Sequence, residues 1–178
     1  MENRRDTTLV RPGELQPYFH RAVHAAAGEQ GLEADQATLH YLTLLLCRYA
    51  RSDHLFDYDQ QRLQLRPLAL VYADAVAAPN SAERRLWLQR LGDLALFVGG
   101  RFAGRLNRHF RDLDYCVAMG GNAYGHLGQT AARSGEQGLA NVFGELAGRF
   151  AHFVELVAVV TGQQVDQRPT TPADRRVH

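Results

Sequence analysis

The chain contains no lysine. Its 20 lysine-or-arginine residues are all arginine, and isoleucine is missing as well. The simplest explanation of both absences is a GC-rich genome, which favours arginine, alanine, glycine, leucine and valine codons. The chemical consequence is the same whatever the cause. Without lysine the chain cannot form a Schiff base, anchor pyridoxal phosphate or supply the lysine of a phosphate-binding P-loop.

Serine and cysteine are also scarce. The three serines, Ser52, Ser81 and Ser134, lie in neither a GxSxG nor an SxxK motif, which argues against a serine hydrolase. Cys47 and Cys116 are far apart in the chain and neither belongs to a CxxC pair, so we expect idle, buried thiols in a reducing compartment. No GxGxxG follows a strand-like run. We therefore predict no catalytic residues, and we lean against an enzyme.

Size and charge indicate one ordinary globular domain. The chain has 178 residues, of which 46% are hydrophobic and 22% charged. The net charge of +1 gives no general electrostatic reason to bind nucleic acid or an acidic membrane. The N-terminus lacks the apolar region of a signal peptide, and no apolar stretch approaches about 18 residues. We expect a cytoplasmic protein that neither spans a membrane nor binds nucleic acid.

Helical periodicity dominates the sequence. Apolar residues recur at helical spacing from Pro17 to Val160, and the alternation typical of strands is nearly missing. We predict an all-α, single-domain bundle of about five or six helices. The helical domain is expected to cover residues 13–162, with a flexible N-terminal tail at 1–12 and a disordered C-terminal tail at 163–178.

One helix is expected to be central, and the closing helix is expected to carry a broad apolar stripe. Asn80 to Glu83 offers a capping box for a helix that becomes apolar over most of its circumference beyond Gly92. The closing helix is predicted as one continuous element from Glu136 to Val160. The predicted core residues are Leu94, Phe97, Val98, Met119, Phe143, Leu146, Phe150 and Phe153.

The helices between residues 91 and 128 are unusually rich in glycine. Glycine costs a helix roughly 0.8–1.0 kcal/mol relative to alanine, so several glycines indicate close backbone approach or space for a ligand. Glycines recur four residues apart in three pairs: Gly100 and Gly104, Gly121 and Gly125, Gly144 and Gly148. Tight helix packing is one interpretation, and a pocket or a dimer interface is the other.

If the glycines line a pocket, nearby polar side chains would complete it. Asp93 is of special interest, because a carboxylate on an apolar helix needs a partner such as an arginine or a capped helix end. The same residues are also ordinary core and boundary residues. The candidate pocket residues are Asp93, Tyr115, Gly120, Gly121, Tyr124, Gly125 and His126.

An arginine-rich elbow separates the two glycine-rich helices. Four arginines would follow one helical face at steps of three and four residues: Arg101, Arg105, Arg108 and Arg111. Guanidinium groups bind phosphates and carboxylates in bidentate fashion, so a phosphorylated ligand or an acidic partner could dock there. The alternative is a solvated face that pairs with Asp112 and Asp114.

The 8 histidines do not form a recognisable metal motif. His20 and His24 are four residues apart, which suits two ligands on one helix. His152 and Glu155 have the reverse order of the Glu-x-x-His motif of di-iron bundles, and the pair occurs once. A haem ligand from His20, His126 or His152 has no CxxCH motif to support it. We predict no metal and no cofactor.

The region Leu91–Val160 resembles an uncharacterised family of all-helical bacterial proteins. The resemblance rests on the segments GDLALFVGGRF, DLDYCVAMGGNAY and VFGELAGRFAHFVELVAVV, which follow the patterns GDxxLFxxG and DYxxxMGxxAY and a Phe-rich closing helix. It implies no activity. It does imply that one structural unit contains Gly92, Asp93, Asp114, Tyr115, Met119, Gly120 and Tyr124.

Two functions from different classes remain open. The first is a non-catalytic bacterial regulatory or adaptor protein that acts through a helical protein–protein interface and forms a homodimer. Its positive support is a surplus of apolar faces on the central and closing helices. The alternative is a ligand- or metal-binding helical bundle, such as an oxygenase-like enzyme, with the glycine-rich pocket as its site.

Overall fold

The computed structural model describes residues 13–51, 66–103 and 110–166. Regular structure within these ranges is entirely helical, with no strand, which confirms the all-α prediction. None of the helices in these ranges is long and apolar enough to cross a membrane. The described helices are α1 (Leu15–Glu29), α2 (Gln36–Arg51), α3 (Arg66–Ala77), α4 (Ser81–Arg101), α6 (Phe110–Arg133), α7 (Gln137–Gly148) and α8 (Phe150–Asp166).

The predicted number of five or six helices is too low, because the closing segment forms two helices. Arg149 adopts φ −128° and ψ 29°, outside helical geometry, and divides α7 from α8. The backbone hydrogen bonds continue across the bend, since Arg149 N–H donates to Glu145 and its carbonyl accepts from Phe153 N–H. The Arg149 guanidinium donates to the Glu33 carbonyl, so a contact with the α1–α2 loop stabilises the bend.

Local signals in the sequence set several helix boundaries. Asn80 caps α4 as predicted: its side-chain oxygen accepts the Glu83 N–H over 2.9 Å, and its amide donates to the Glu83 carboxylate over 3.2 Å. Gly31 and Gly135 have φ of +61° and +76°, so the turns after α1 and α6 use a conformation that favours glycine. Pro17 lies in the first turn of α1, where its missing N–H costs nothing.

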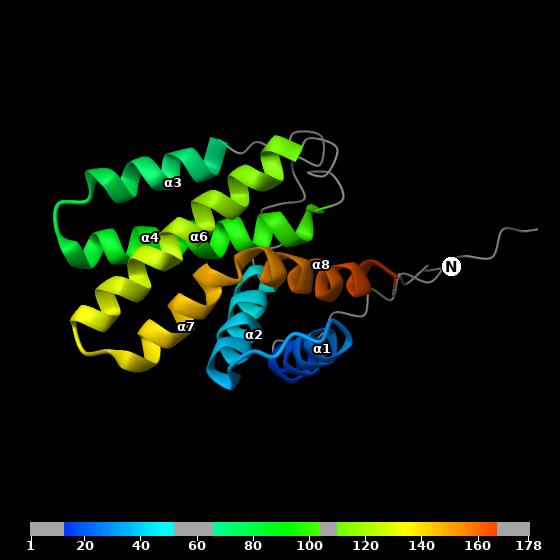
Figure 1. Cartoon of the computed structure of the whole chain (residues 1–178). Helices are drawn as coiled ribbons and strands as arrows, with labels where there is room; N and C mark the ends of the chain where they lie inside the picture. Colours follow the sequence, from blue (N-terminus) through cyan, green and yellow to red (C-terminus); the bar gives the residue numbers. More distant parts are fainter. Residues whose placement is uncertain (1–12, 52–65, 104–109, 167–178) are drawn as a thin grey trace, which may run out of the picture.

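Helix α4 is the centre of the fold (Figure 1). Helices α3, α6 and α8 pack against it, and α7 packs along α6. Helices α1 and α2 form a pair that contacts α8 and α7, so the first and last described helices lie together.

The predicted core is correct for its aromatic residues. Phe97, Phe143, Phe150 and Phe153 are all buried, as is Leu146. The other three predicted core residues are only partly buried and pack against the edge of the core: Leu94, Val98 and Met119.

Candidate functional site

A buried carboxylate joins three helices. Asp93 on α4 is 1% exposed. Its Oδ1 accepts hydrogen bonds from the hydroxyl groups of Tyr124 on α6, at 2.7 Å, and Tyr41 on α2, at 2.5 Å. Its Oδ2 accepts from Arg48 Nη1 on α2 at 2.9 Å. The Gln89 amide donates to the Tyr41 oxygen over 3.1 Å. The network therefore satisfies the buried charge that the sequence placed on α4.

Electrostatics in this network keep the tyrosines as donors. Burial raises the pKa of both Tyr41 and Tyr124 well above 10.0, and the neighbouring carboxylate raises it further. Burial also raises the pKa of Asp93, while the hydrogen bonds from the two tyrosines and the Arg48 charge lower it. Both hydroxyl protons therefore stay in place at neutral pH and point at the carboxylate.

Sequence reasoning found part of this network. It placed Asp93 in the interior with an arginine as a plausible partner, and Arg48 is that arginine. It missed Tyr41 and Gln89. Tyr41 and Arg48 are seven residues apart on α2 and share a face, which is the signal that the sequence offers. Nothing local shows that this face meets α4, because that contact is tertiary.

Several glycines allow helices to pack closely, and Gly120 and Gly128 on α6 are two of them. A Cβ atom on Gly120 would overlap the Phe150 ring and lie 2.9 Å from the Ala95 Cβ. A Cβ on Gly128 would lie 3.1 Å from the Gly144 backbone nitrogen, where α6 crosses α7. The space beside Gly120 is therefore already filled by the Phe150 ring.

Of the other candidate pocket residues, Asp93 and Tyr124 are joined by a hydrogen bond, whereas Gly121 and His126 line two separate surface hollows. Gly121 lines a surface hollow of about 410 Å³ at the α7–α8 bend, together with Gly148 and His152. Gly125 lies beside α7, where an added Cβ would be 3.7 Å from the Ala147 Cβ. Tyr115 is half-buried against the core. Asp93 and Tyr124 line neither this hollow nor the groove described next.

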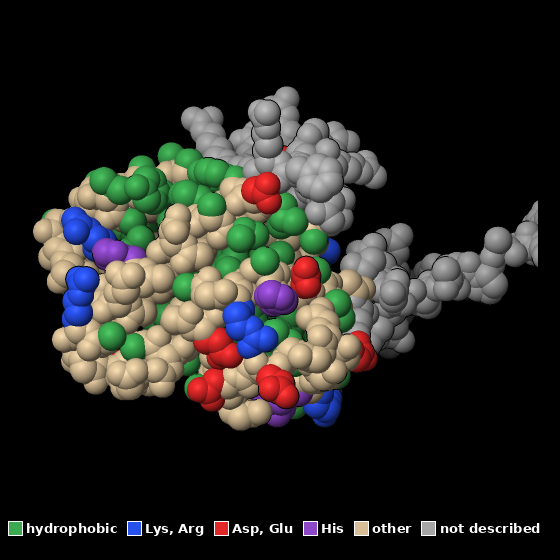
Figure 2. Space-filling view, viewed as in Figure 1, with side chains coloured by type: hydrophobic (Ala, Val, Ile, Leu, Met, Phe, Trp, Pro, Cys, Tyr) green, Lys and Arg blue, Asp and Glu red, His purple; other side chains and the backbone are tan. Residues whose placement is uncertain are grey.

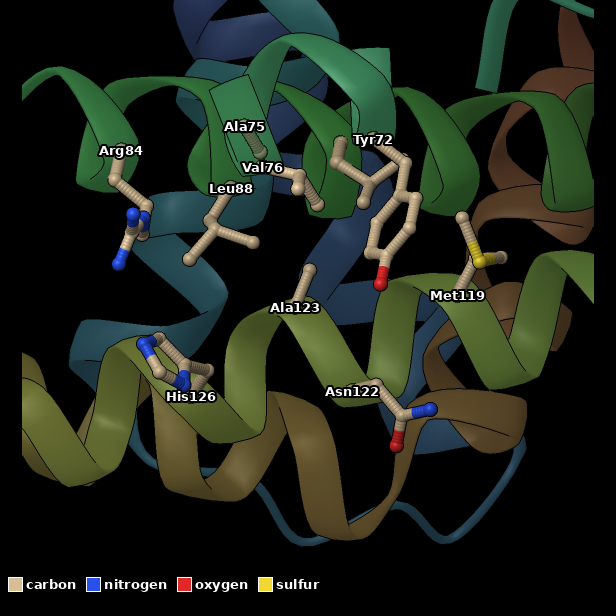
Figure 3. Close-up of a pocket in the computed structure, with 10 residues that line it drawn as sticks. Tyr72, Ala75, Val76, Arg84, Leu88, Met119, Asn122, Ala123 and His126 are labelled. Carbon is tan, nitrogen blue, oxygen red and sulfur yellow. The ribbon is translucent and has the colours of Figure 1, made fainter. Parts of the chain in front are cut away.

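A larger groove of about 540 Å³ lies between α3, α4 and α6. Both α3 and α6 pack against α4, which therefore forms the floor. Arg84 and His126 lie at the same end, while Tyr72 and Met119 lie toward the other end (Figure 3). The lining residues are Tyr72, Ala75 and Val76 of α3, Arg84, Leu88 and Leu91 of α4, and Met119, Asn122, Ala123 and His126 of α6. Of these, His126 is the one that the sequence predicts as a pocket residue.

The solvent side of α3 is unusually apolar. Leu70, Tyr72 and Val76 are 57%, 49% and 60% exposed. Asp74 is the one charged residue between Leu68 and Ala77. Hydrophobic side chains accordingly gather where α3 lies on the face seen in Figure 2. The outer face of a solvated surface helix is usually polar or charged, so α3 has the composition of a helix that another surface covers.

The arginine elbow lies mostly outside the described residues. Arg105 and Arg108 belong to residues 104–109, and the side chain of Arg111 at the start of α6 is likewise not described. Arg101 ends α4, and its guanidinium lies 5.6 Å from the centre of the Phe102 ring. The proposal of a partner-binding or phosphate-binding patch therefore stays a prediction.

The cysteines are buried and carry protonated thiols. Burial raises the pKa of Cys116 to about 11, with a further increase from Asp112. Burial also raises the pKa of Cys47, although Arg51 lowers it. A nucleophilic cysteine needs an ionised thiol, whereas the Cys116 thiol is buried and the nearby sequence candidate for a base, His126, is exposed in the groove.

The histidines do not form a metal site in the described part of the chain. No three histidine, cysteine or carboxylate side chains come together there in a way that would hold a metal ion. The predicted pair His20 and His24 does lie close, with ring centres 4.2 Å apart. The ring nitrogens of His24 are within hydrogen-bond distance of the His20 carbonyl, at 2.8 Å, and the Gln36 side chain, at 3.0 Å.

Comparison with known proteins adds no relative. No family model matches the chain, and no curated protein or solved structure is significantly similar to it. A proposal for the function therefore rests on the geometry of two features, the closed Asp93 network and the open apolar groove.

Proposed function

We propose that this chain is a non-catalytic regulatory or adaptor protein that binds a protein partner through the α3 surface. The α3 surface consists of the groove between α3, α4 and α6 and the exposed side of α3. The observation that carries the proposal is the exposure of Leu70, Tyr72 and Val76 on a helix with one charged residue between Leu68 and Ala77. Burying an apolar side chain of this size stabilises a complex by about 1.5–3 kcal/mol.

The dimensions of the groove suit a helix. Its lining residues extend from Arg84 to Leu91 on α4 and from Met119 to His126 on α6, so the end positions are seven residues apart on each helix. Seven residues rise about 10 Å, or two helical turns. An amphipathic helix that docks in a groove presents side chains at i, i+3, i+4 and i+7, which span the same length. The groove can therefore accept one face of a two-turn helical segment.

The Asp93 network supports this non-catalytic function. All four partner groups are side chains of the chain itself, and Asp93 is buried. A buried, hydrogen-bonded carboxylate of this kind holds α2, α4 and α6 in register. The floor and one wall of the groove belong to α4 and α6, so the network also fixes the shape of the binding surface.

A ligand-binding bundle is the second candidate. The groove volume of about 540 Å³ falls within the range of small-molecule sites. Arg84 and His126 at one end would suit an amphipathic acid, with its apolar part against Leu88 and Met119. Native mass spectrometry of the untagged protein tests this candidate, because a retained small molecule of defined mass would favour it. An absorption spectrum and metal analysis test the metal-dependent, oxygenase-like form.

A matched pair of variants tests the leading proposal. Val76 and Leu86 have nearly equal exposure, 60% and 62%, but Val76 lines the groove and Leu86 does not. We expect Val76→Arg to remove specific partners from a cross-linked pull-down in a lysate of the source cell, and Leu86→Arg to retain them. The same partners with both variants would contradict the proposal. The double variant Arg105→Glu/Arg108→Glu tests the arginine elbow separately. If this variant loses the partners and Val76→Arg retains them, the interface lies at the elbow and not at the α3 surface.

A further inference from the structure

The exposed side of α3 has the pattern of a docking helix. Leu70, Ala73, Asp74 and Ala77 are all exposed and occupy positions i, i+3, i+4 and i+7. They therefore share one face of the helix, on the other side from Tyr72 and Val76 in the groove wall. The chain thus carries both a two-turn groove and a two-turn apolar helix face.

We infer that the partner at the α3 surface is a second copy of this chain, with each α3 docking its Leu70–Ala77 face at the groove of the other copy. The inference rests on the proposed function and names its partner. Charge supports it, since Arg84 and His126 line one end of the groove and no carboxylate lines it. Asp74 is the one charge on the docking face. Neither Arg84 nor Asp74 forms an ion pair with another residue in the described part of the chain.

Reciprocal docking gives a closed dimer. In a two-fold arrangement the same surface is used by both subunits, so each contact occurs twice. The two α3 helices would lie side by side, each between the α3 and the α6 of the other subunit. Tyr72 and Val76 would contact the partner's α3, and Leu70 would contact the partner's α6. All exposed apolar residues of α3 would then be covered, and Asp74 would approach the Arg84 end of the opposite groove.

Sedimentation equilibrium of the full-length chain at low ionic strength tests the inference. We expect a dimer for the wild type and for Leu86→Arg, and a monomer for Val76→Arg. Circular dichroism should show the same helix content in all three, because residues 76 and 86 are exposed. A monomeric wild type, or equal dimerisation of the two variants, would overturn the inference.

A charge-swap experiment asks whether the two halves of the interface meet. Arg84→Glu and Asp74→Arg should each weaken self-association roughly tenfold, because every mismatched charge pair occurs twice in the dimer. Mixing the two variants should restore association to near the wild-type strength, since each heterodimer again has opposite charges at both contacts. No gain on mixing would overturn the assignment of these residues to one contact.

The same variants separate the inference from the proposed function. A monomeric wild type whose pull-down partners depend on Val76 would overturn the second-copy inference and leave the protein-binding function standing. A monomeric wild type whose partners do not depend on Val76 would overturn both. A dimer that is insensitive to Val76→Arg would move the self-association to another surface and so overturn the inference.

Discussion

The ring of Tyr124 occupies the space that a side chain at Gly92 would need. A Cβ atom built on Gly92 would lie 2.5 Å from Tyr124 Cε1, while the Tyr124 hydroxyl donates to the adjacent Asp93 over 2.7 Å. The glycine and the aspartate of the GD pair therefore serve the same tyrosine. One leaves room for the ring and the other binds its hydroxyl group. This contact joins the two sequence patterns into one structural unit through Asp93 and Tyr124, which are 31 residues apart.

Gly92→Ala should destabilise the fold. Alanine is the better helix former by about 1 kcal/mol, but its methyl group would displace the Tyr124 ring, and overpacking of a core costs about 1–3 kcal/mol. We expect a lower urea midpoint with an unchanged slope. Gly121→Ala is the matched control, since its Cβ would lie 3.8 Å from the nearest atom. It should be neutral or stabilising, and equal behaviour of the two variants would contradict this account of Gly92.

Tyr124→Phe should cost about 1.5–3 kcal/mol of unfolding free energy. The substitution keeps the ring and removes one hydrogen bond to a buried, charged acceptor. Tyr115→Phe on the same helix is the control, because Tyr115 is half-buried and forms no hydrogen bond through its hydroxyl in the described structure. We expect its effect to stay within about 0.5 kcal/mol. Similar losses in both variants by urea unfolding would argue against a special role for the Asp93 contact.

The stability of the wild type relative to Asp93→Asn should depend on pH. Burial raises the pKa of Asp93 above 3.8, so the folded state holds this proton at pH values where the unfolded chain has released it. The contribution is complete below 3.8 and is lost as the pH rises through the pKa of the folded state. As the pH rises across that window, the wild type should therefore lose unfolding free energy relative to Asp93→Asn. A difference that is constant with pH would contradict the raised pKa.

Phe150→Ala should be among the most damaging single substitutions. Phe150 is buried, packs against Gly120 and lies 5.8 Å from the Tyr124 ring, centre to centre. Removing a buried phenylalanine costs about 3–5 kcal/mol because of the cavity that it leaves. Thermal unfolding followed by circular dichroism measures the loss. A loss below about 1 kcal/mol would mean that the side chain is not in the core.

The features that sequence predicted best are those that local chemistry decides. The Asn80–Glu83 capping box is such a case, because its two partners are three residues apart. The sequence also indicated that Asp93 needs a partner, with an arginine or a capped helix end as the two options, and Arg48 is the partner in the structure. Helical periodicity settled the fold class for the same reason.

The features that sequence missed depend on which faces meet. Gly120 and Gly121 are neighbours with opposite roles: one accepts the Phe150 ring, and the other lines an open hollow. A rotation of about 100° per residue separates them, and the sequence does not say which direction faces α8. The bend at Arg149 was missed because a long-range contact to Glu33 accompanies it, with no proline to mark the position. The groove was missed because residues of three helices line it, and the sequence does not show how these helices are arranged.

The bend at Arg149 has a consequence for synthesis. The Arg149 guanidinium binds the Glu33 carbonyl, and the Glu145 carboxylate accepts the Asp35 N–H over 3.2 Å. These partners are 116 and 110 residues apart in the chain. At roughly 5–20 residues per second, a ribosome needs about 6–23 s to make the second partner after the first. During that time Glu33 and Asp35 in the α1–α2 loop lack these two partners, so the contacts that hold this loop against the bend form late in synthesis.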